Sequence, residues 1–239
     1  MKRISIQNVV SGVKCFLPFC LLTFLPLTAA AQDQPEYRLE IGGGIGLVAY
    51  EGDFNGNILK NQQPMFSIIG KYRYTPRTAL GMNISIGQIK GSASDVTTYY
   101  PDARVDADYK FKHMLADVGV RYEYNFWPYG TGHEYRGAKR LTPYIYIGVG
   151  MTVAKPSKTE LAMNLPLGGG IKYKAADRLN AAIEWTMHFG TNDWIDGEGD
   201  PYGVKSSGMF KNTDCYSHLR LTLSYDLWAK CKTCHNDRD

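Results

Sequence analysis

The stretch from Lys112 to Phe126, KHMLADVGVRYEYNF, constrains the fold of this chain more than any other. Every second residue from Met114 onward is apolar or aromatic, and the residues between them, from Asp117 to Asn125, are polar or glycine. A period of two predicts a β-strand, because a helix repeats every 3.6 residues. The row is about as long as a tilted strand needs to cross a bilayer. We therefore predict a transmembrane strand with lipid on one face and a polar lumen on the other.

Seven further segments repeat this alternation with varying clarity. Together with the first stretch they predict eight strands at Tyr37–Tyr50, Pro64–Tyr74, Leu80–Gly87, Lys112–Phe126, Pro143–Val153, Met163–Lys174, Asn180–Phe189 and Cys215–Trp228. An even number of alternating segments is typical of outer-membrane barrels. A soluble β-sandwich is the alternative, since its strands also alternate.

The N-terminus has the pattern of a cleavable secretory signal. A basic head, MKR, is followed by an apolar run from Cys15 to Leu27 and by three small residues that end at Ala31. The apolar run is short for a spanning helix and contains two prolines. We expect cleavage after Ala31, which makes residues 1–31 the signal, 32–228 the barrel and 229–239 a periplasmic tail.

Charge argues against a nucleic-acid partner. Removal of residues 1–31 deletes three basic residues and no acid, so the formal charge falls from +4 to +1. The basic isoelectric point therefore reflects the signal and not a binding surface. No later segment is apolar enough for a membrane helix, and a closed barrel is the other structure that satisfies every backbone hydrogen bond in lipid.

The connections between the predicted strands differ in length. The first, second and fourth loops on one side are long, whereas the turns at 75–78 and 175–178 on the other side are short. Outer-membrane barrels have long extracellular loops and short periplasmic turns. The chain is thus predicted to form an all-β, eight-stranded antiparallel up-and-down barrel in the outer membrane, with both termini in the periplasm.

The inward faces of the predicted strands carry a balanced set of charges. They are Arg38, Lys71, Arg73, Arg121, Lys172 and Arg220 against Glu40, Asp117, Glu123, Glu184 and Asp226. An eight-stranded barrel is just wide enough for its own side chains. We expect these charges to pair into a plug of salt bridges, which argues against a pore.

Catalytic and metal sites are poorly supported. His188 near Asp193 and Asp196 is the best candidate for a hydrolytic site at the extracellular rim, but no nucleophile stands at a defined spacing from a base. The acidic loop from Asp193 to Asp200 could wrap Ca²⁺, yet its spacing does not fit an EF-hand loop. We expect no enzyme activity, no cofactor and no metal.

The C-terminal tail holds a Cys-x-x-Cys-His pattern at Cys231, Cys234 and His235. The pattern is that of c-type haem attachment, but no nearby methionine is placed as a second axial ligand, and no βαβ pattern supports a thioredoxin-type dithiol. Cys215 starts the last strand, about 40 Å of extended chain from Cys231, so these two cannot pair in one monomer. Cys231 can close a small loop with Cys234, or either can bond a periplasmic partner.

Several phrases along the chain resemble the PorG-like outer-membrane barrels of Bacteroidota. They are GLVAYEGDFN, YRYTPRTALGMNISIGQIKGS, VGVRYEYNFWPYG, LTPYIYIGVG and AIEWTMHFGTNDWIDG, and the similarity runs from about Glu36 to Trp228. That family includes a component of the type IX secretion system, which associates with a periplasmic ring containing the lipoprotein PorK and the protein PorN. The resemblance implies a structural or anchoring role in protein secretion, and it assigns no interface residues.

The predicted function is therefore a non-enzymatic component of type IX secretion that contacts outer-membrane lipids and the ring lipoprotein. A disulfide from Cys231 or Cys234 is one way in which the contact with the lipoprotein can form. The first alternative is a generic small barrel that acts as an adhesin or membrane stabiliser through its extracellular loops. An outer-membrane hydrolase is the second alternative.

Overall fold

The structure is a computed structural model of the whole chain, and it describes residues 36–52, 54–55, 57, 59–95, 109–132, 137–155, 159–191, 195 and 214–229. The predicted signal, most of the long loop between the last two strands and the C-terminal tail lie outside these residues.

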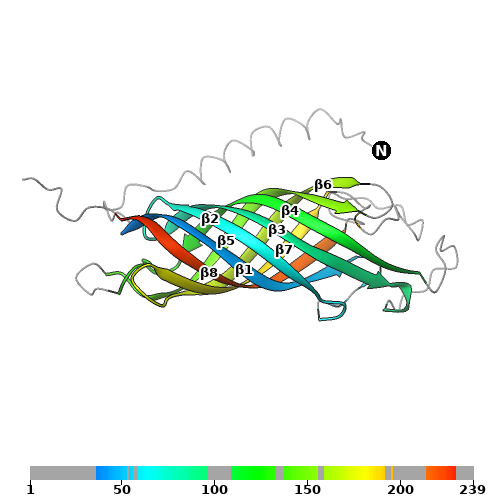
Figure 1. Ribbon diagram of the computed structural model, residues 1–239, viewed down its shortest axis with the longest axis horizontal. Coiled ribbons are helices and arrows are strands. Elements are labelled where there is room, and N and C mark those ends of the chain that lie inside the picture. The colour runs from blue at the N-terminus through cyan, green and yellow to red at the C-terminus, as the bar shows by residue number, and fades with distance from the viewer. Residues whose placement is uncertain are drawn as a thin grey trace, which may run out of the picture. The chain divides into compact units, whose positions relative to one another are not determined.

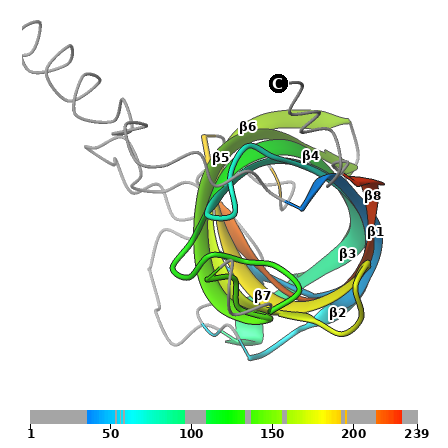
Figure 2. The ribbon, with the colours of Figure 1, turned by 90° about the vertical axis from the view of Figure 1, so that its left-hand side faces the viewer.

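The described residues form a closed barrel of eight strands in which each strand pairs antiparallel with its neighbours in chain order, and the last pairs with the first. Figure 1 shows the barrel from the side and Figure 2 shows it along its axis. The strands are β1 Tyr37–Glu51, β2 Gln63–Arg73, β3 Thr78–Ser92, β4 Lys110–Asn125, β5 Leu141–Lys155, β6 Glu160–Lys174, β7 Leu179–Gly190 and β8 Cys215–Ala229. A short 3₁₀ helix, η1 Ala93–Asp95, follows β3.

The register of the strands fixes the width of the barrel. Leu39 in β1 pairs with Tyr72 in β2, and following the paired residues from strand to strand around the barrel returns to β1 at Ala49. The two positions in β1 differ by ten residues, which is the stagger of the barrel. With a rise of about 3.3 Å per residue and about 4.8 Å between strands, this stagger tilts the strands by about 40°. A barrel of eight strands at this tilt has room inside for side chains and little else.

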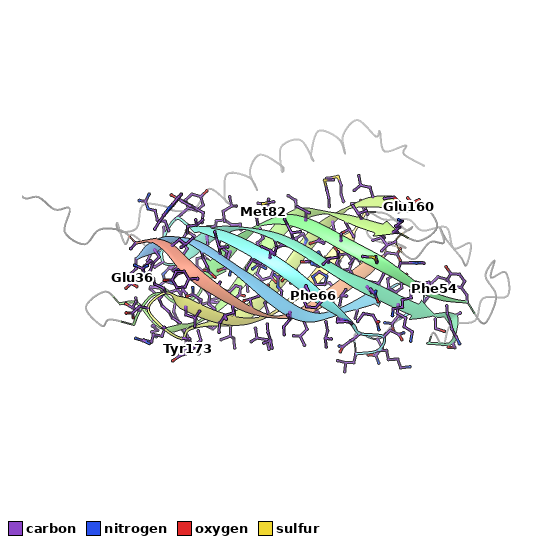
Figure 3. The ribbon with its side chains drawn as sticks, in the orientation of Figure 1. Glu36, Phe54, Phe66, Met82, Glu160 and Tyr173 are labelled. Carbon is purple, nitrogen blue, oxygen red and sulfur yellow. The ribbon has the colours of Figure 1, made fainter. Side chains whose placement is uncertain are left out.

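Alternation along each strand separates an apolar outside from a polar inside. In β4 the predicted apolar row is exposed, with Val118 and Val120 more than 40% accessible, while Asp117, Arg121 and Glu123 are buried. Phe66 and Met82, labelled on the wall in Figure 3, belong to the same outward face and are also exposed. Large apolar side chains exposed on every strand are stable only against lipid, so the predicted transmembrane barrel is confirmed.

The two ends of the barrel differ in their connections. At one end, here called the turn end, β1 begins, β8 ends, and residues 74–77, 126–140 and 175–178 link neighbouring strands. The opposite end, the loop end, carries the connections 52–62, 93–109, 156–159 and 191–214. Figure 3 labels Glu36 and Tyr173 near the turn end, and Phe54 and Glu160 near the loop end.

The predicted turn around Pro76 is built from local hydrogen bonds. The Thr75 hydroxyl accepts bonds from the backbone N–H of Arg77 at 3.1 Å and of Thr78 at 3.0 Å, and the Thr78 amide also reaches the Thr75 carbonyl. Proline presets the backbone for such a turn, and the threonine hydroxyl satisfies amides that the strands cannot.

The strands extend further toward the loop end than the sequence predicts. The expected third strand ends at Gly87, whereas β3 reaches Ser92, and the expected sixth begins at Met163, whereas β6 begins at Glu160. In β3 and β5 the added residues end the lipid-facing apolar row, because Lys90 and Lys155 stand there in outward positions, whereas Leu161 extends the row by one position in β6. Backbone pairing continues past the membrane-facing band, so hydropathy alone underestimates strand length.

Among the described residues, no helix is both long and apolar enough to cross a membrane.

The lumen as the candidate functional site

The turn end of the lumen is closed by Tyr129, which lies in the connection between β4 and β5. Its ring is buried, and its hydroxyl donates a hydrogen bond to the Asn180 side chain at 2.8 Å. Backbone bonds hold the segment in place: the Tyr129 amide donates to the Pro76 carbonyl, and the Lys139 amide donates to the Pro128 carbonyl. Burial raises the pKa of Tyr129 well above its usual range, so the hydroxyl keeps the proton that it donates.

Asp226 is the first acid above this cap. Its carboxylate accepts bonds from the Arg73 guanidinium at 2.9 and 3.2 Å, from Lys174 at 2.5 Å and from the Asn180 amide at 2.8 Å. The side chain is fully buried, and the four donor contacts replace the water that it loses. Arg73 and Lys174 also lie over the face of the Tyr129 ring, at 5.3 and 5.6 Å from its centre.

Lysine side chains link the next two acids. The Lys71 ammonium lies 3.1 Å from Glu123 and 3.7 Å from Glu40, and Lys172 pairs with Glu123. Glu40 also forms an ion pair with Arg73, which connects this layer to the one below. All of these side chains are at most 4% exposed. Each acid therefore has at least two basic partners, as the desolvation cost of a buried charge requires.

Glu184 is the centre of the layer above. Arg121 binds both of its oxygens at 3.1 and 3.0 Å, Arg220 donates from Nε at 2.5 Å, and the Tyr144 hydroxyl donates at 2.6 Å. The Arg121 guanidinium also stacks 4.2 Å from the centre of the Tyr146 ring. A carboxylate with two guanidinium groups and a phenol has its lone pairs satisfied, which makes this the most fully bonded acid in the described lumen.

We call the ten charged residues of these layers the charge network. It comprises Glu40, Lys71, Arg73, Arg121, Glu123, Lys172, Lys174, Glu184, Arg220 and Asp226.

Inward glycines make room for the large side chains of the network. A Cβ atom added at Gly168 would lie 2.6 Å from the Tyr146 ring and 2.5 Å from the Trp185 carbonyl. Tyr146 fills the space above Gly168 and bonds the Thr186 hydroxyl. Glycine is therefore required here for close approach and not for an unusual backbone angle.

The next layer toward the loop end is centred on Asp117, whose partners are neutral polar side chains. Its carboxylate accepts bonds from Asn83 at 3.1 Å, Asn164 at 2.8 Å and the Tyr216 hydroxyl at 3.0 Å. His188 stacks on the Tyr216 ring with the ring centres 4.4 Å apart, and its Nδ1 lies 3.8 Å from Asp117. Two amides and a phenol thus replace the Lys and Arg partners found below.

The loop end of the lumen is filled by apolar and aromatic side chains, which we call the apolar plug. The plug comprises Val48, Tyr50, Phe54, Met65, Ile89, Phe111, Leu115, Ala154, Ala162, Ile195 and Tyr216, all at most 5% exposed. Phe111 is its centre, since its ring meets Tyr50 edge-on at 5.1 Å and Phe54 at 6.0 Å. The Tyr50 hydroxyl bonds Asp214 at 2.5 Å.

Near the apolar plug, a void between Met65, Leu115 and His218 has no room for a water molecule. Among the residues that the structure describes, no group of three or more His, Cys, Asp or Glu side chains is placed to hold a metal ion. The geometry supports packing and ion pairing, and the lumen of these residues is closed at both ends.

The structure places ten of the eleven predicted lumen charges inside the barrel and corrects one. Glu40, Lys71, Arg73, Asp117, Arg121, Glu123, Lys172, Glu184, Arg220 and Asp226 are buried. Arg38 is exposed, and its guanidinium reaches the Tyr72 hydroxyl at 3.5 Å. It stands one residue inside the start of β1, where an arginine can remain hydrated and avoid the cost of desolvation.

Asp117 requires a second correction. It is inside, as predicted, but its bonds go to neutral partners and not to Lys or Arg. On the inner face of β4, Gly119 lies between Asp117 and Arg121. The only arginine of this strand is therefore not the inward neighbour of Asp117.

The predicted set of lumen charges is incomplete. It leaves out Lys174, although the alternation of the sixth strand places Lys174 and Asn164 on the inward face, and it does not give Asn164 and Asn180 as partners of the acids. Tyr129 could not be found this way, because it lies in a connection and enters the lumen only when the segment 126–140 folds back. The predicted cysteine pair Cys231 and Cys234 and the acidic loop residues Asp193 and Asp196 lie outside the described residues.

His188, the predicted candidate for a hydrolytic site, lies inside the barrel. Its ring is buried between Tyr216 and His218, and its Nδ1 lies 3.3 Å from the Asn164 side chain. A catalytic base must reach substrate, and this imidazole lies beneath the apolar plug.

Closed pairing, an apolar outer face and a filled lumen define a transmembrane β-barrel. This chain belongs to the family described as a domain of unknown function, DUF6089, whose model matches residues 16–236. Comparison with curated proteins gives no match. The assignment to PorG-like barrels of Bacteroidota stays a prediction.

Three solved barrels illustrate the structural likeness. Neisserial surface protein A is 11% identical with a TM-score of 0.46, and the match covers 79% of this chain and 97% of that one. The outer membrane protein OprG from Pseudomonas aeruginosa is 11% identical with a TM-score of 0.46, covering 84% and 100%. The N-terminal β-barrel domain of Pseudomonas aeruginosa OprF is 14% identical with a TM-score of 0.44, covering 81% and 100%.

Proposed function

We propose that this chain is a non-conducting structural barrel of the outer membrane that anchors a protein-secretion machine of the type IX class. The observation that carries the proposal is the filled lumen. The charge network closes the turn half and the apolar plug closes the loop half, so the barrel is suited to making contacts and not to passing solutes. Its resemblance to PorG-like barrels supplies the particular machine.

Conductance tests the first part of the proposal. The purified barrel, reconstituted in a planar bilayer, is expected to give no steps above the lipid baseline at moderate voltage. Regular conductance steps from the folded protein would contradict a structural role for a closed barrel.

In the proposed orientation the turn end faces the periplasm and the loop end faces outside. Support comes from the lengths of the connections, since the two longest, 93–109 and 191–214, both lie at the loop end. An epitope tag inserted in 93–109 is expected to bind antibody on intact cells, whereas a tag placed after residue 229 is expected to need a permeabilised outer membrane. The reverse pattern would invert the assignment.

A periplasmic contact follows from this orientation. The proposed partner is the ring of PorK and PorN, with a disulfide from Cys231 or Cys234 as the version that is easiest to test. The experiment is a pull-down of tagged protein from native outer membranes in mild detergent, with and without reductant. Recovery of the ring lipoprotein in a thiol-sensitive adduct, lost in the Cys231→Ser/Cys234→Ser variant and retained in Cys215→Ser, is the expected result.

The second candidate function is an adhesin or membrane stabiliser that acts through the long loop-end connections. Recovery of the barrel alone in the pull-down, together with loss of surface attachment when 191–214 is shortened, would favour it over the secretion role. We propose no catalytic role, because the buried setting of His188 gives substrate no access.

A further inference from the structure

Four lysines form a patch on the outer wall near the loop end. Lys90 lies in β3, Lys110 and Lys112 in β4, and Lys155 in β5, and all four are exposed. We call these residues the lysine patch. They stand at outward-facing positions, because their neighbours along the strands, Ile89, Phe111 and Ala154, point inward and are buried in the apolar plug.

The strand register brings these lysines together. Lys90 pairs directly with Lys112 across β3 and β4, and Lys155 pairs with Met114, the outward position next to Lys112. Directly opposed residues on one face have Cβ atoms about 5 Å apart, and diagonal neighbours are about 7–8 Å apart. Like charges in directly opposed positions destabilise a sheet unless a counter-charge lies between them.

Within the described strands β3, β4 and β5, no acidic residue stands on this part of the wall. β3 and β5 contain no acidic residue, and the two acids of β4, Asp117 and Glu123, are buried in the lumen. The exposed cations of the turn end differ, because they have partners within the chain. Arg77 donates to the Phe126 carbonyl at 2.7 Å, and Lys139 lies 4.6 Å from the centre of the Trp127 ring.

The position of the patch indicates where its counter-charge comes from. On each of the three strands the last exposed apolar residues, Ile86, Met114 and Val153, are followed toward the loop end by the lysines. The lysines therefore stand at the upper edge of the lipid-facing band, at the level of the headgroups. Lysine suits this place, since its stem lies along apolar surface while its ammonium reaches the polar layer.

We propose that the lysine patch binds the headgroup of a phosphorylated glycolipid of the lipopolysaccharide class in the outer leaflet. The patch spans three strands, about 10 Å across, so one anionic group can bridge the opposed pair Lys90 and Lys112 while a second lies against Lys155. A headgroup with several anionic groups on a sugar scaffold can neutralise the whole patch, whereas a single phosphodiester carries one negative charge against four lysines. The inference rests on the proposed orientation and not on the secretion role.

The test measures lipid binding by the isolated barrel, so it does not depend on any secretion partner. The full mature chain in mild detergent is titrated by native mass spectrometry with rough lipopolysaccharide, with the same lipid after enzymatic removal of its phosphates, and with phosphatidylglycerol. The wild type is expected to retain the phosphorylated glycolipid at least tenfold better than either of the other two. Equal retention of the dephosphorylated lipid or of phosphatidylglycerol would overturn the proposal.

Variants separate the patch from general charge. Lys90→Gln/Lys112→Gln is expected to weaken glycolipid binding at least tenfold, and Lys90→Arg/Lys112→Arg is expected to stay within about threefold of wild type. Arg38→Gln/Lys139→Gln, which removes two exposed cations from the turn end, is the matched control and is expected to bind normally. All variants are first shown to be folded by their heat-sensitive gel mobility. An equal loss in the control, or none in the patch variant, would refute the site.

Discussion

The turn half and the loop half of the lumen are filled in opposite ways. The turn half holds the charge network, in which Glu184 alone accepts bonds from two arginines and a tyrosine. The loop half holds the apolar plug, in which Phe111 packs against other rings. Both halves occupy the same barrel with the same strands, so side-chain chemistry and not backbone geometry makes the difference.

This difference has an energetic consequence. A buried ion pair contributes little net stability when complete but becomes costly when one member is removed, because the other is left as an unpaired charge. An apolar side chain contributes in proportion to the surface that it buries, and its removal leaves a cavity. The turn half should therefore be sensitive to single charge changes, and the loop half to changes of volume.

The largest effect is expected for Glu184→Gln. The substitution keeps the size of the side chain but leaves Arg121 and Arg220 without their shared carboxylate, so the free energy of unfolding should fall by about 3–5 kcal/mol. Urea unfolding in lipid vesicles, followed by tryptophan fluorescence, measures it. A second variant, Glu184→Leu/Arg121→Met/Arg220→Met, should recover most of the loss because no unpaired charge remains. A fall below about 1 kcal/mol for Glu184→Gln would show that this layer is solvated.

Phe111→Ala should lower the free energy of unfolding by about 3 kcal/mol, because it removes a ring that contacts Tyr50 and Phe54. The measurement is the same urea transition. Phe111→Leu retains most of the volume and is the control, with an expected loss of at most about 1.5 kcal/mol. The variant should stay non-conducting in a planar bilayer, since the charge network still closes the turn half. Open channels from Phe111→Ala alone would mean that the plug is the main barrier.

Gly168→Ala tests the space between the halves. The added methyl would meet the Tyr146 ring and the Trp185 carbonyl, so the strands must shift, at a cost of about 2 kcal/mol. Gly70 is the matched control, because a Cβ atom there has nothing within 4 Å. Gly70→Ala should leave the urea midpoint unchanged or slightly raised. Equal effects at the two positions would indicate strand propensity and not crowding.

The smallest effect is expected for Tyr129→Phe at the turn-end cap. The substitution removes the 2.8 Å hydrogen bond to Asn180 but keeps the buried ring, so the free energy of unfolding should fall by about 1 kcal/mol. Because burial raises the pKa of Tyr129, the wild-type cap should also lose stability as the pH rises above about 10, where the unfolded chain releases this proton. Urea midpoints at pH 8 and pH 10.5 should differ less in Tyr129→Phe than in wild type.

Much of the lumen was predictable from strand periodicity, and the failures have clear causes. Glu123 and Arg121 were placed correctly because the alternation in β4 is unbroken on both faces. Arg38 was misplaced because alternation gives the face of a strand but not its distance from the rim, where a charged group can turn toward water. The partners of Asp117 could not be predicted, since they come from β3, β6 and β8 and depend on the stagger.

The sequence by itself determined that the chain makes eight alternating strands with lipid outside and charges inside, because a period of two is a local property that each segment carries alone. Only the tertiary structure decided which acid meets which base, that Tyr129 closes the turn end, and that Lys90 faces Lys112 on the outer wall. These contacts join residues far apart in the chain. They depend on the ten-residue stagger that accumulates around the closed barrel, and no single strand encodes it.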